Sequence, residues 1–145
     1  MASILVAVDG SPGAQRALAH ACRLAAQQGA HLVLVHVIGG LGLPEPALRA
    51  LAQTKHGWFD EMLDAASAEV LQQAREQALA QGVSAPTLES RRGDVVPALL
   101  EAARAHAAES IVVGRRGAHH AVALPLGSVS RAVASLSPIP AIVVP

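Results

Sequence analysis

The stretch that decides the fold reads Ile111-Val112-Val113-Gly114-Arg115-Arg116-Gly117 and continues, after nine further residues, with Gly127-Ser128. The apolar run predicts a strand, the two glycines that follow predict a loop, and Gly127-Ser128 predicts the start of a helix. Glycine lets a backbone turn at positive φ or approach a ligand closely, and the free N–H groups of a helix start favour an anion. We therefore expect a phosphate site with Gly114, Gly117, Gly127 and Ser128 as contacts, to which Ser130 could add a hydroxyl.

Two features of this loop leave alternatives open. The glycines could form only a tight turn, and Gly127-Ser128 could only cap a helix. Arg115 and Arg116 could give charge-assisted contacts to phosphate oxygens, or could be solvated loop residues. The Walker pattern and the dinucleotide-binding fingerprint, the two common phosphate-binding motifs, do not occur in the chain.

The rest of the chain alternates apolar runs with segments whose apolar residues recur at helical spacing. The runs predict five strands, at 3–8, 31–37, 84–91, 111–113 and 139–144. The segments between them predict helices at 12–28, 55–81, 95–107 and 128–136. Alternation of this kind indicates an α/β fold, and 145 residues suit a single domain. We expect an open, twisted, five-stranded parallel sheet of the Rossmann-like type, with helices on both faces.

The strand order follows from an argument about the ligand. Ligands of such sheets lie beyond the carboxyl ends of the strands, where the winding reverses. Asp9 ends the first strand and Gly114 ends the fourth. If both contact one ligand, these strands are neighbours and the order is 3-2-1-4-5. The alternative for Asp9 is that it only forms a turn or caps the helix that follows it.

The spacing Gly-x-x-Gly, nine residues, Gly-Ser resembles that of the nucleotide-binding branch of the universal stress protein family, and the resemblance extends over residues 1–145. It implies the same strand order and an ATP ligand, with Mg²⁺ as a possible companion. It also implies a homodimer in which the terminal strands pair. For the nucleoside it implies a contact from Asp9 and a backbone contact from Val37. Ala7 and Val129 complete the set of expected nucleotide contacts. The chain departs from the family pattern at Arg115, where members commonly carry a hydroxyl residue, and at Ala118, where they carry a bulky apolar one.

Composition limits the classes of partner. Eleven basic residues balance eleven acidic ones, so no strong field attracts nucleic acid or an anionic membrane. No apolar run reaches the roughly 20 residues of a membrane span, no room is left for a signal peptide before the first strand, and the single cysteine fits a reducing compartment. We expect a cytoplasmic protein. With one Trp, one Phe and no Tyr, aliphatic side chains and backbone would have to hold a bound base.

Residues that could support catalysis or bind a metal are few. The phosphate loop has no lysine, and Asp9 is the one acid expected at a strand end in the site. Cys22 is expected to be a packed residue rather than a nucleophile, and His119 and His120 lack nearby metal ligands. We expect a regulatory ATP-binding protein with slow or incidental hydrolysis. The alternatives are an interaction module of the same fold, acting through the loop at 38–54, and an adenylating enzyme.

Overall fold

The computed structural model describes residues 2–39, 46, 58–116 and 126–145 of the chain. Its centre is a five-stranded sheet in which every neighbouring pair of strands is parallel. The strands are β1 (Ser3–Ala7), β2 (His31–Ile38), β3 (Thr87–Arg92), β4 (Ala108–Gly114) and β5 (Ala141–Val144). Their order is β3-β2-β1-β4-β5, which confirms the predicted topology.

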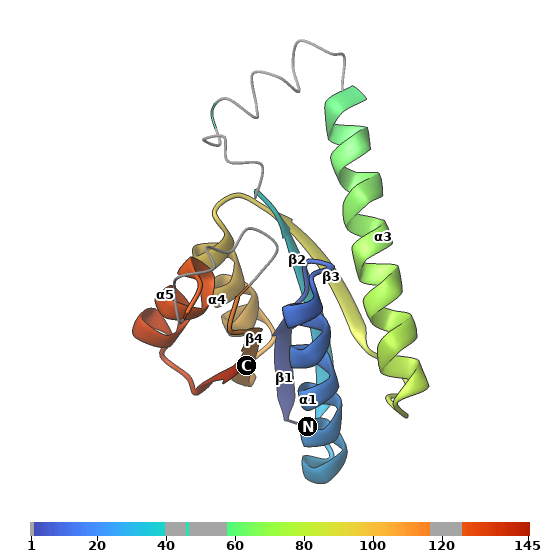
Figure 1. The fold of residues 1–145 in the computed structure, drawn as a ribbon, viewed down its shortest axis with the longest axis vertical. Coiled ribbons are helices and arrows are strands. Elements are labelled where there is room, and N and C mark those ends of the chain that lie inside the picture. Colours follow the sequence, from blue (N-terminus) through green and yellow to red (C-terminus); the bar gives the residue numbers. More distant parts are fainter. Residues whose placement is uncertain (1, 40–45, 47–57, 117–125) are drawn as a thin grey trace.

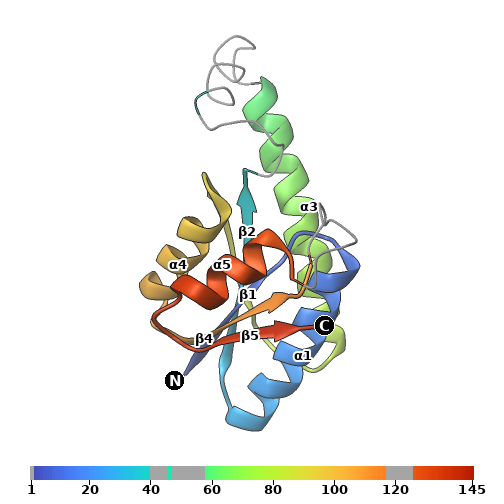
Figure 2. The ribbon, with the colours of Figure 1, turned by 60° about the vertical axis from the view of Figure 1, so that its left-hand side comes forward.

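Helices cover both faces of the sheet (Figure 2). One face packs against α1 (Pro12–Gln28) and α3 (Trp58–Ala80), and the other against α4 (Val95–Ala105) and α5 (Ser128–Leu136). Successive residues of β1 serve the two layers in turn, because side chains alternate along a strand. Ile4 and Val6 pack under α1 and α3, whereas Leu5 packs under α4, and all three are at most 1% exposed. The central strands are therefore buried on both faces, as their apolar runs predict.

Local signals set the ends of several elements. Ser11 caps α1 by accepting the Ala14 N–H at 3.1 Å, and Gly29 ends this helix in the left-handed conformation. The third strand begins at Thr87, directly after Pro86, and lies at the sheet edge. Pro86 is tolerated there because proline has no N–H to donate to a neighbouring strand, and an edge strand needs fewer such donors. The amino-terminal end of α3 projects beyond the carboxyl ends of the strands (Figure 1).

Several expectations about element boundaries and faces are wrong. The third strand, expected at 84–91, spans Thr87–Arg92. The helix expected at 95–107, α4, ends at Ala105, and β4 begins at Ala108, three residues before the predicted start. The cause is Ala107, whose φ of 50° breaks the helix, so that this residue is exposed instead of lying on a buried helix face. Leu136 continues the helical spacing of Val129 and Val133, which predicts a place on the apolar face of the last helix, but it is 65% exposed at the end of α5.

Within the described ranges, no helix is both long and apolar enough to cross a bilayer.

Candidate functional site

The carboxyl ends of β1 and β4 lie side by side, since the two strands pair in register up to Val6 and Val112. The chain leaves β1 toward α1 on one face of the sheet and reaches α5 on the other face after β4. This is the point where the winding reverses, at which open α/β sheets bind their ligands. The structure thus brings the ends of the two predicted site strands, Asp9 and Gly114, to the same edge.

Gly114 has a packing requirement of its own. A Cβ built on Gly114 would lie 2.8 Å from the carbonyl carbon and oxygen of Gly13, closer than real Cβ atoms come to backbone. A Cβ on Gly13 would in turn overlap the Arg116 carbonyl oxygen. The pair of glycines lets the first turn of α1 touch the loop after β4. The fold therefore accounts for Gly114 without any ligand, and a phosphate contact would be an additional role.

The main chain of Arg115 is held by three hydrogen bonds. Its N–H donates to the Val144 carbonyl at 2.7 Å. Its carbonyl accepts from the Gly127 N–H at 2.7 Å and from the Ser130 hydroxyl, also at 2.7 Å. Ser130 is buried, 1% exposed, so its hydroxyl ties the loop to α5. The sequence does not reveal this structural role, because it depends on a contact between residues 15 positions apart.

The side chain of Arg115 carries an unsatisfied donor. Its Nε is buried and, in the part of the chain that the structure describes, is the one buried side-chain nitrogen or oxygen without a hydrogen-bond partner. Leaving a buried donor unpaired costs about 1–3 kcal/mol, and more for a charged group. Native proteins pair nearly all such atoms, so an orphan of this kind calls for an explanation.

The start of α5 offers further donors, which have no acceptor inside the helix. Gly127 occupies the N-cap position and provides no side-chain cap, and the Arg131 N–H makes the first helical bond, to the Gly127 carbonyl at 3.1 Å. The N–H groups of Ser128, Val129 and Ser130 therefore have no acceptor within the helix. No acidic residue lies in this first turn. These amides and the positive end of the helix dipole favour an anion.

Charge along the sequence gives a signal that motif reading misses. All eleven acidic residues precede Ser110, whereas three arginines, Arg115, Arg116 and Arg131, follow it. The chain is neutral overall, but the segment from Ser110 onward, which supplies most of β4, the glycine loop and α5, carries only basic charged side chains. Two of the three arginines lie in the loop itself, which suits a negatively charged ligand.

The predicted nucleoside contacts lie nearby on β1 and β2. Asp9 is exposed, and its Oδ1 accepts the Ser11 N–H at 2.9 Å. This bond is the turn role considered for Asp9, and it engages one of the two carboxylate oxygens. Ala7 is half-buried, and Val37, 9% exposed, packs in the layer under α4. Gly117, His119, His120 and most of the 38–54 loop lie outside the described residues.

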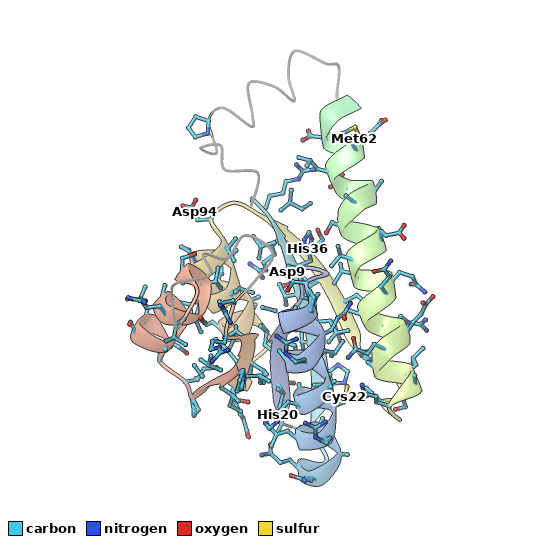
Figure 3. The ribbon with its side chains drawn as sticks, viewed as in Figure 1. Asp9, His20, Cys22, His36, Met62 and Asp94 are labelled. Atoms are coloured by element: carbon cyan, nitrogen blue, oxygen red, sulfur yellow. The ribbon has the colours of Figure 1, made fainter. Side chains whose placement is uncertain are left out.

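Sequence reading missed His36, which lies close enough to Asp9 to sense its charge (Figure 3). The His36 Nδ1 lies 2.7 Å from the Ser67 Oγ of α3, and that oxygen lies 2.8 Å from the Ser90 Oγ of β3. Burial lowers the pKa of His36 below its ordinary 6.5, and the Asp9 charge opposes this effect more weakly. Contacts across 31 and 23 residues leave no pattern in a sequence.

Nucleophile and metal chemistry find little support among the described residues. Cys22 is 2% exposed, and burial raises the pKa of its thiol, with Arg23 as a weaker opposing influence. This agrees with its expected role as a packed residue. No group of three His, Cys, Asp or Glu side chains that could hold a metal ion occurs in the described ranges.

Comparison with known proteins adds independent information. The model of the universal stress protein family matches residues 1–145. Universal stress protein YxiE of Bacillus subtilis is 33% identical over 144 residues, which cover 97% of this chain and 97% of that protein. A universal stress protein of Thermus aquaticus is 34% identical over 143 residues, with 98% and 97% covered.

Solved structures agree with these relatives. Universal stress protein UspA from Lactobacillus plantarum superposes with a TM-score of 0.81 at 25% identity, covering 99% of this chain and 97% of that one. A universal stress protein in complex with cAMP gives a TM-score of 0.73 at 26% identity, with the same coverage. Because the family model spans the whole sequence and two relatives match along nearly their full lengths, the chain belongs to the universal stress protein family.

Proposed function

We propose that this protein binds an adenine nucleotide, with ATP as the expected ligand, across the carboxyl ends of β1 and β4. The observation that carries this proposal is the buried, unpaired Nε of Arg115, a residue whose carbonyl accepts from Gly127 and Ser130 at the start of α5, where no side chain caps the helix. A phosphate oxygen is the acceptor that both groups lack. The complex of a related family member with cAMP supports an adenine nucleotide in particular.

The phosphates would lie against α5. The free N–H groups of Ser128, Val129 and Ser130 would donate to phosphate oxygens, and Arg115 would add a charge-assisted bond. Arg116, in the same loop, is a second guanidinium for this purpose. Gly127 would allow close approach of the phosphates, because it brings no side chain to the N-cap. Gly114 would do the same beside Gly13, and Gly117 keeps its predicted place in the loop.

The nucleoside would lie toward β2. The Asp9 carboxylate, which also accepts the Ser11 N–H, would accept from a ribose hydroxyl or an amino group. The backbone of Val37 would meet the edge of the adenine, and Ala7 would form part of the floor. Mg²⁺, where present, would enter with the phosphates and keep much of its water, as it does in many nucleotide sites.

The role that this site supports is regulatory. Asp9 is the acid that the proposal uses, and it is assigned to the nucleoside rather than to an attacking water. Hydrolysis of ATP would then be slow or incidental, because positioning of a nucleophile is a main part of phosphoryl-transfer catalysis. Occupancy of the site, rather than turnover, would carry the signal.

The proposal includes a homodimer formed through β5. This strand is last in the sheet order and pairs with β4 along one edge. Its four residues, Ala141 to Val144, are all half-buried in the single chain. An apolar edge strand of this kind is a template for pairing with another chain, and a two-fold axis would satisfy both copies.

The test is a set of binding isotherms for ATP, ADP, AMP and cAMP, with mass spectrometry of nucleotides released from freshly purified protein. We expect binding of adenine nucleotides, with affinity decreasing as phosphates are removed from ATP. Absence of binding to all four ligands at millimolar concentration would refute the proposal and favour an interaction module. Steady conversion of ATP to AMP and pyrophosphate would instead indicate an adenylating enzyme.

A further inference from the structure

One arginine links the start of α1 to the carboxyl end of β5. The Nε of Arg16 donates to the Pro145 carbonyl at 3.1 Å. Pro145 directly follows β5, so this bond places the guanidinium at the edge of the sheet where the proposed site lies. Figure 2 shows the carboxyl end of β5 beside α1. Arg16 therefore reaches the carboxyl edge of the sheet although it belongs to a helix that covers one face.

The same guanidinium lies beside the glycine loop. Its Nη2 is 3.8 Å from the place that a Cβ on Gly13 would take, and the Arg116 carbonyl oxygen borders the same place. The Arg116 Cα lies 3.3 Å from the place of a Cβ on Gly127, the N-cap of α5. A single loop residue, Arg116, therefore contacts both the turn beside Arg16 and the start of α5.

The charge of Arg16 has no acidic partner in the part of the chain that the structure describes. The ion pairs found there involve Arg91, Arg92 and His106 as their cations. Arg16 is exposed, and its bond to Pro145 uses a neutral carbonyl oxygen. A cation that no carboxylate neutralises, next to the loop proposed to bind phosphate, suits a negatively charged ligand.

The strand order gives the direction in which a bound nucleotide would run. In the order β3-β2-β1-β4-β5, the proposed nucleoside contacts lie at β1 and β2, and the loop with Arg115 follows β4. Neighbouring strands lie about 4.8 Å apart, so β5 lies about 14 Å from β2. A chain of phosphates that begins at the nucleoside would extend past β4 toward β5, and its last phosphate would come nearest to Arg16. A single phosphate would end before it.

We propose that Arg16 is a specificity-determining residue of the nucleotide site, which binds the terminal phosphate of ATP and favours a triphosphate over a monophosphate. This inference rests on the proposed nucleotide function. The bond to Pro145 uses only the Nε of the guanidinium, so Nη1 and Nη2 are the groups that would donate to phosphate oxygens. The bond to Pro145 would hold the side chain in place for this contact.

The test compares the dissociation constants of ATP and AMP, measured by calorimetry, in the native chain and in Arg16→Gln. Glutamine removes the charge and keeps a good helix former at this position. ATP binding should weaken about fivefold, the value of an exposed ion pair at the upper end of its range. AMP binding should change by less than about 1.5-fold, because its phosphate would lie outside the short range of a screened charge. A merely structural role would not change the ratio of the two constants.

Arg23→Gln is the matched control. Arg23 is also exposed on α1, and it lies seven residues after Arg16, which places it about 10 Å farther from the carboxyl edge. Its replacement removes the same charge, so we expect both dissociation constants to stay within about 1.5-fold of the native values. In 1 M salt, where the Debye length is about 3 Å, the effect of Arg16→Gln on ATP binding should largely disappear. Thermal melting of each variant checks the fold.

The outcomes separate this inference from the proposed function. If the native chain binds ATP but Arg16→Gln weakens ATP and AMP equally, or weakens neither, the specificity role is refuted. An effect of Arg23→Gln as large as that of Arg16→Gln would refute it too, because net charge alone would then explain the loss. If the native chain binds no nucleotide, the proposed function fails. Inorganic tripolyphosphate then tests the anion contact alone: it should raise the Tm of the native chain more than that of Arg16→Gln, and equal shifts would overturn the inference.

Discussion

Replacement of Arg115 by methionine should move the stability of the free protein and its response to nucleotide in opposite directions. In the free protein the buried Nε is an unpaired donor. Its removal should raise the free energy of unfolding by about 1 kcal/mol, the low end of the cost of such a group, because the rest of the side chain is partly exposed. Methionine keeps the unbranched apolar stem, and the three main-chain bonds of Arg115 do not depend on the side chain.

The response to nucleotide should fall. For the native chain, ATP at 100 times its dissociation constant adds about 2.7 kcal/mol to stability. If the guanidinium contributes one charge-assisted bond, its loss weakens binding at least about tenfold. The same ATP concentration then adds only about 1.4 kcal/mol, since it is about ten times the new dissociation constant. At roughly 3 °C per kcal/mol for a chain of this size, the ATP-induced rise in Tm should drop from about 8 °C to about 4 °C.

The assay is thermal unfolding with and without ATP, and the matched control is Arg131→Met. Arg131 lies in the same acid-free segment, on α5, but is exposed. Its replacement removes the same charge without touching the buried donor, so we expect little change in either quantity. If Arg115→Met lowers the stability of the free protein and leaves the ATP response intact, Arg115 is a structural residue and the reasoning fails.

Three further predictions follow from other contacts. Gly13→Ala should destabilise the protein by about 1–3 kcal/mol in urea unfolding, because the alanine Cβ would overlap the Arg116 carbonyl. Alanine normally stabilises a helix relative to glycine, so a gain in stability would contradict the packing described. The lowered pKa of His36 means that the unfolded chain binds its proton more tightly, so this group's contribution to stability is full above about pH 6.5 and is lost as pH falls through the folded pKa. His36→Gln should remove that part of the pH dependence, and an unchanged profile of unfolding free energy against pH would refute the assignment. Val143→Pro should convert a dimer into a folded monomer in analytical ultracentrifugation. The Pro140 and Val144 carbonyls face β4, so by alternation the Val143 N–H faces the open edge, where proline would remove it as a donor to a second copy. Persistence of the dimer would exclude β5 as the interface.

The sequence predicts the sheet correctly because its strongest signals are local. Each of these signals determines the structure of residues only a few positions away in the sequence: the apolar run at Ile111 for β4, the proline before Thr87 for the start of β3, and Ser11 for the start of α1. The strand order needed one further assumption, that Asp9 and Gly114 serve a common ligand, and the topology agrees with it. The family assignment followed from the same glycine spacing, and the comparisons support it over the full chain.

Features that depend on distant backbone contacts could not be read in advance. Ala107 adopts a positive φ although neither Gly nor Asn marks the position, so the end of α4 was placed too late. The motif alone predicts that Gly114 contacts a ligand, whereas the backbone that a side chain at 114 would meet first is that of Gly13, about a hundred positions earlier. Ser130 was considered for its hydroxyl toward phosphate, but the structure uses that hydroxyl on the Arg115 carbonyl. The residues named as nucleotide contacts stay predictions until the isotherms are measured.

The hydrogen bond from the Arg115 amide to the Val144 carbonyl has a consequence for assembly. It joins, through one peptide group, the residue expected to meet phosphate and the strand expected to meet a second copy. If both expectations hold, a ligand that shifts Arg115 also shifts the subunit contact, and thermodynamic reciprocity then requires that dimerisation alter nucleotide affinity by the same factor. Dimerisation and ATP binding would then be linked equilibria, so the apparent dissociation constant for ATP should depend on protein concentration.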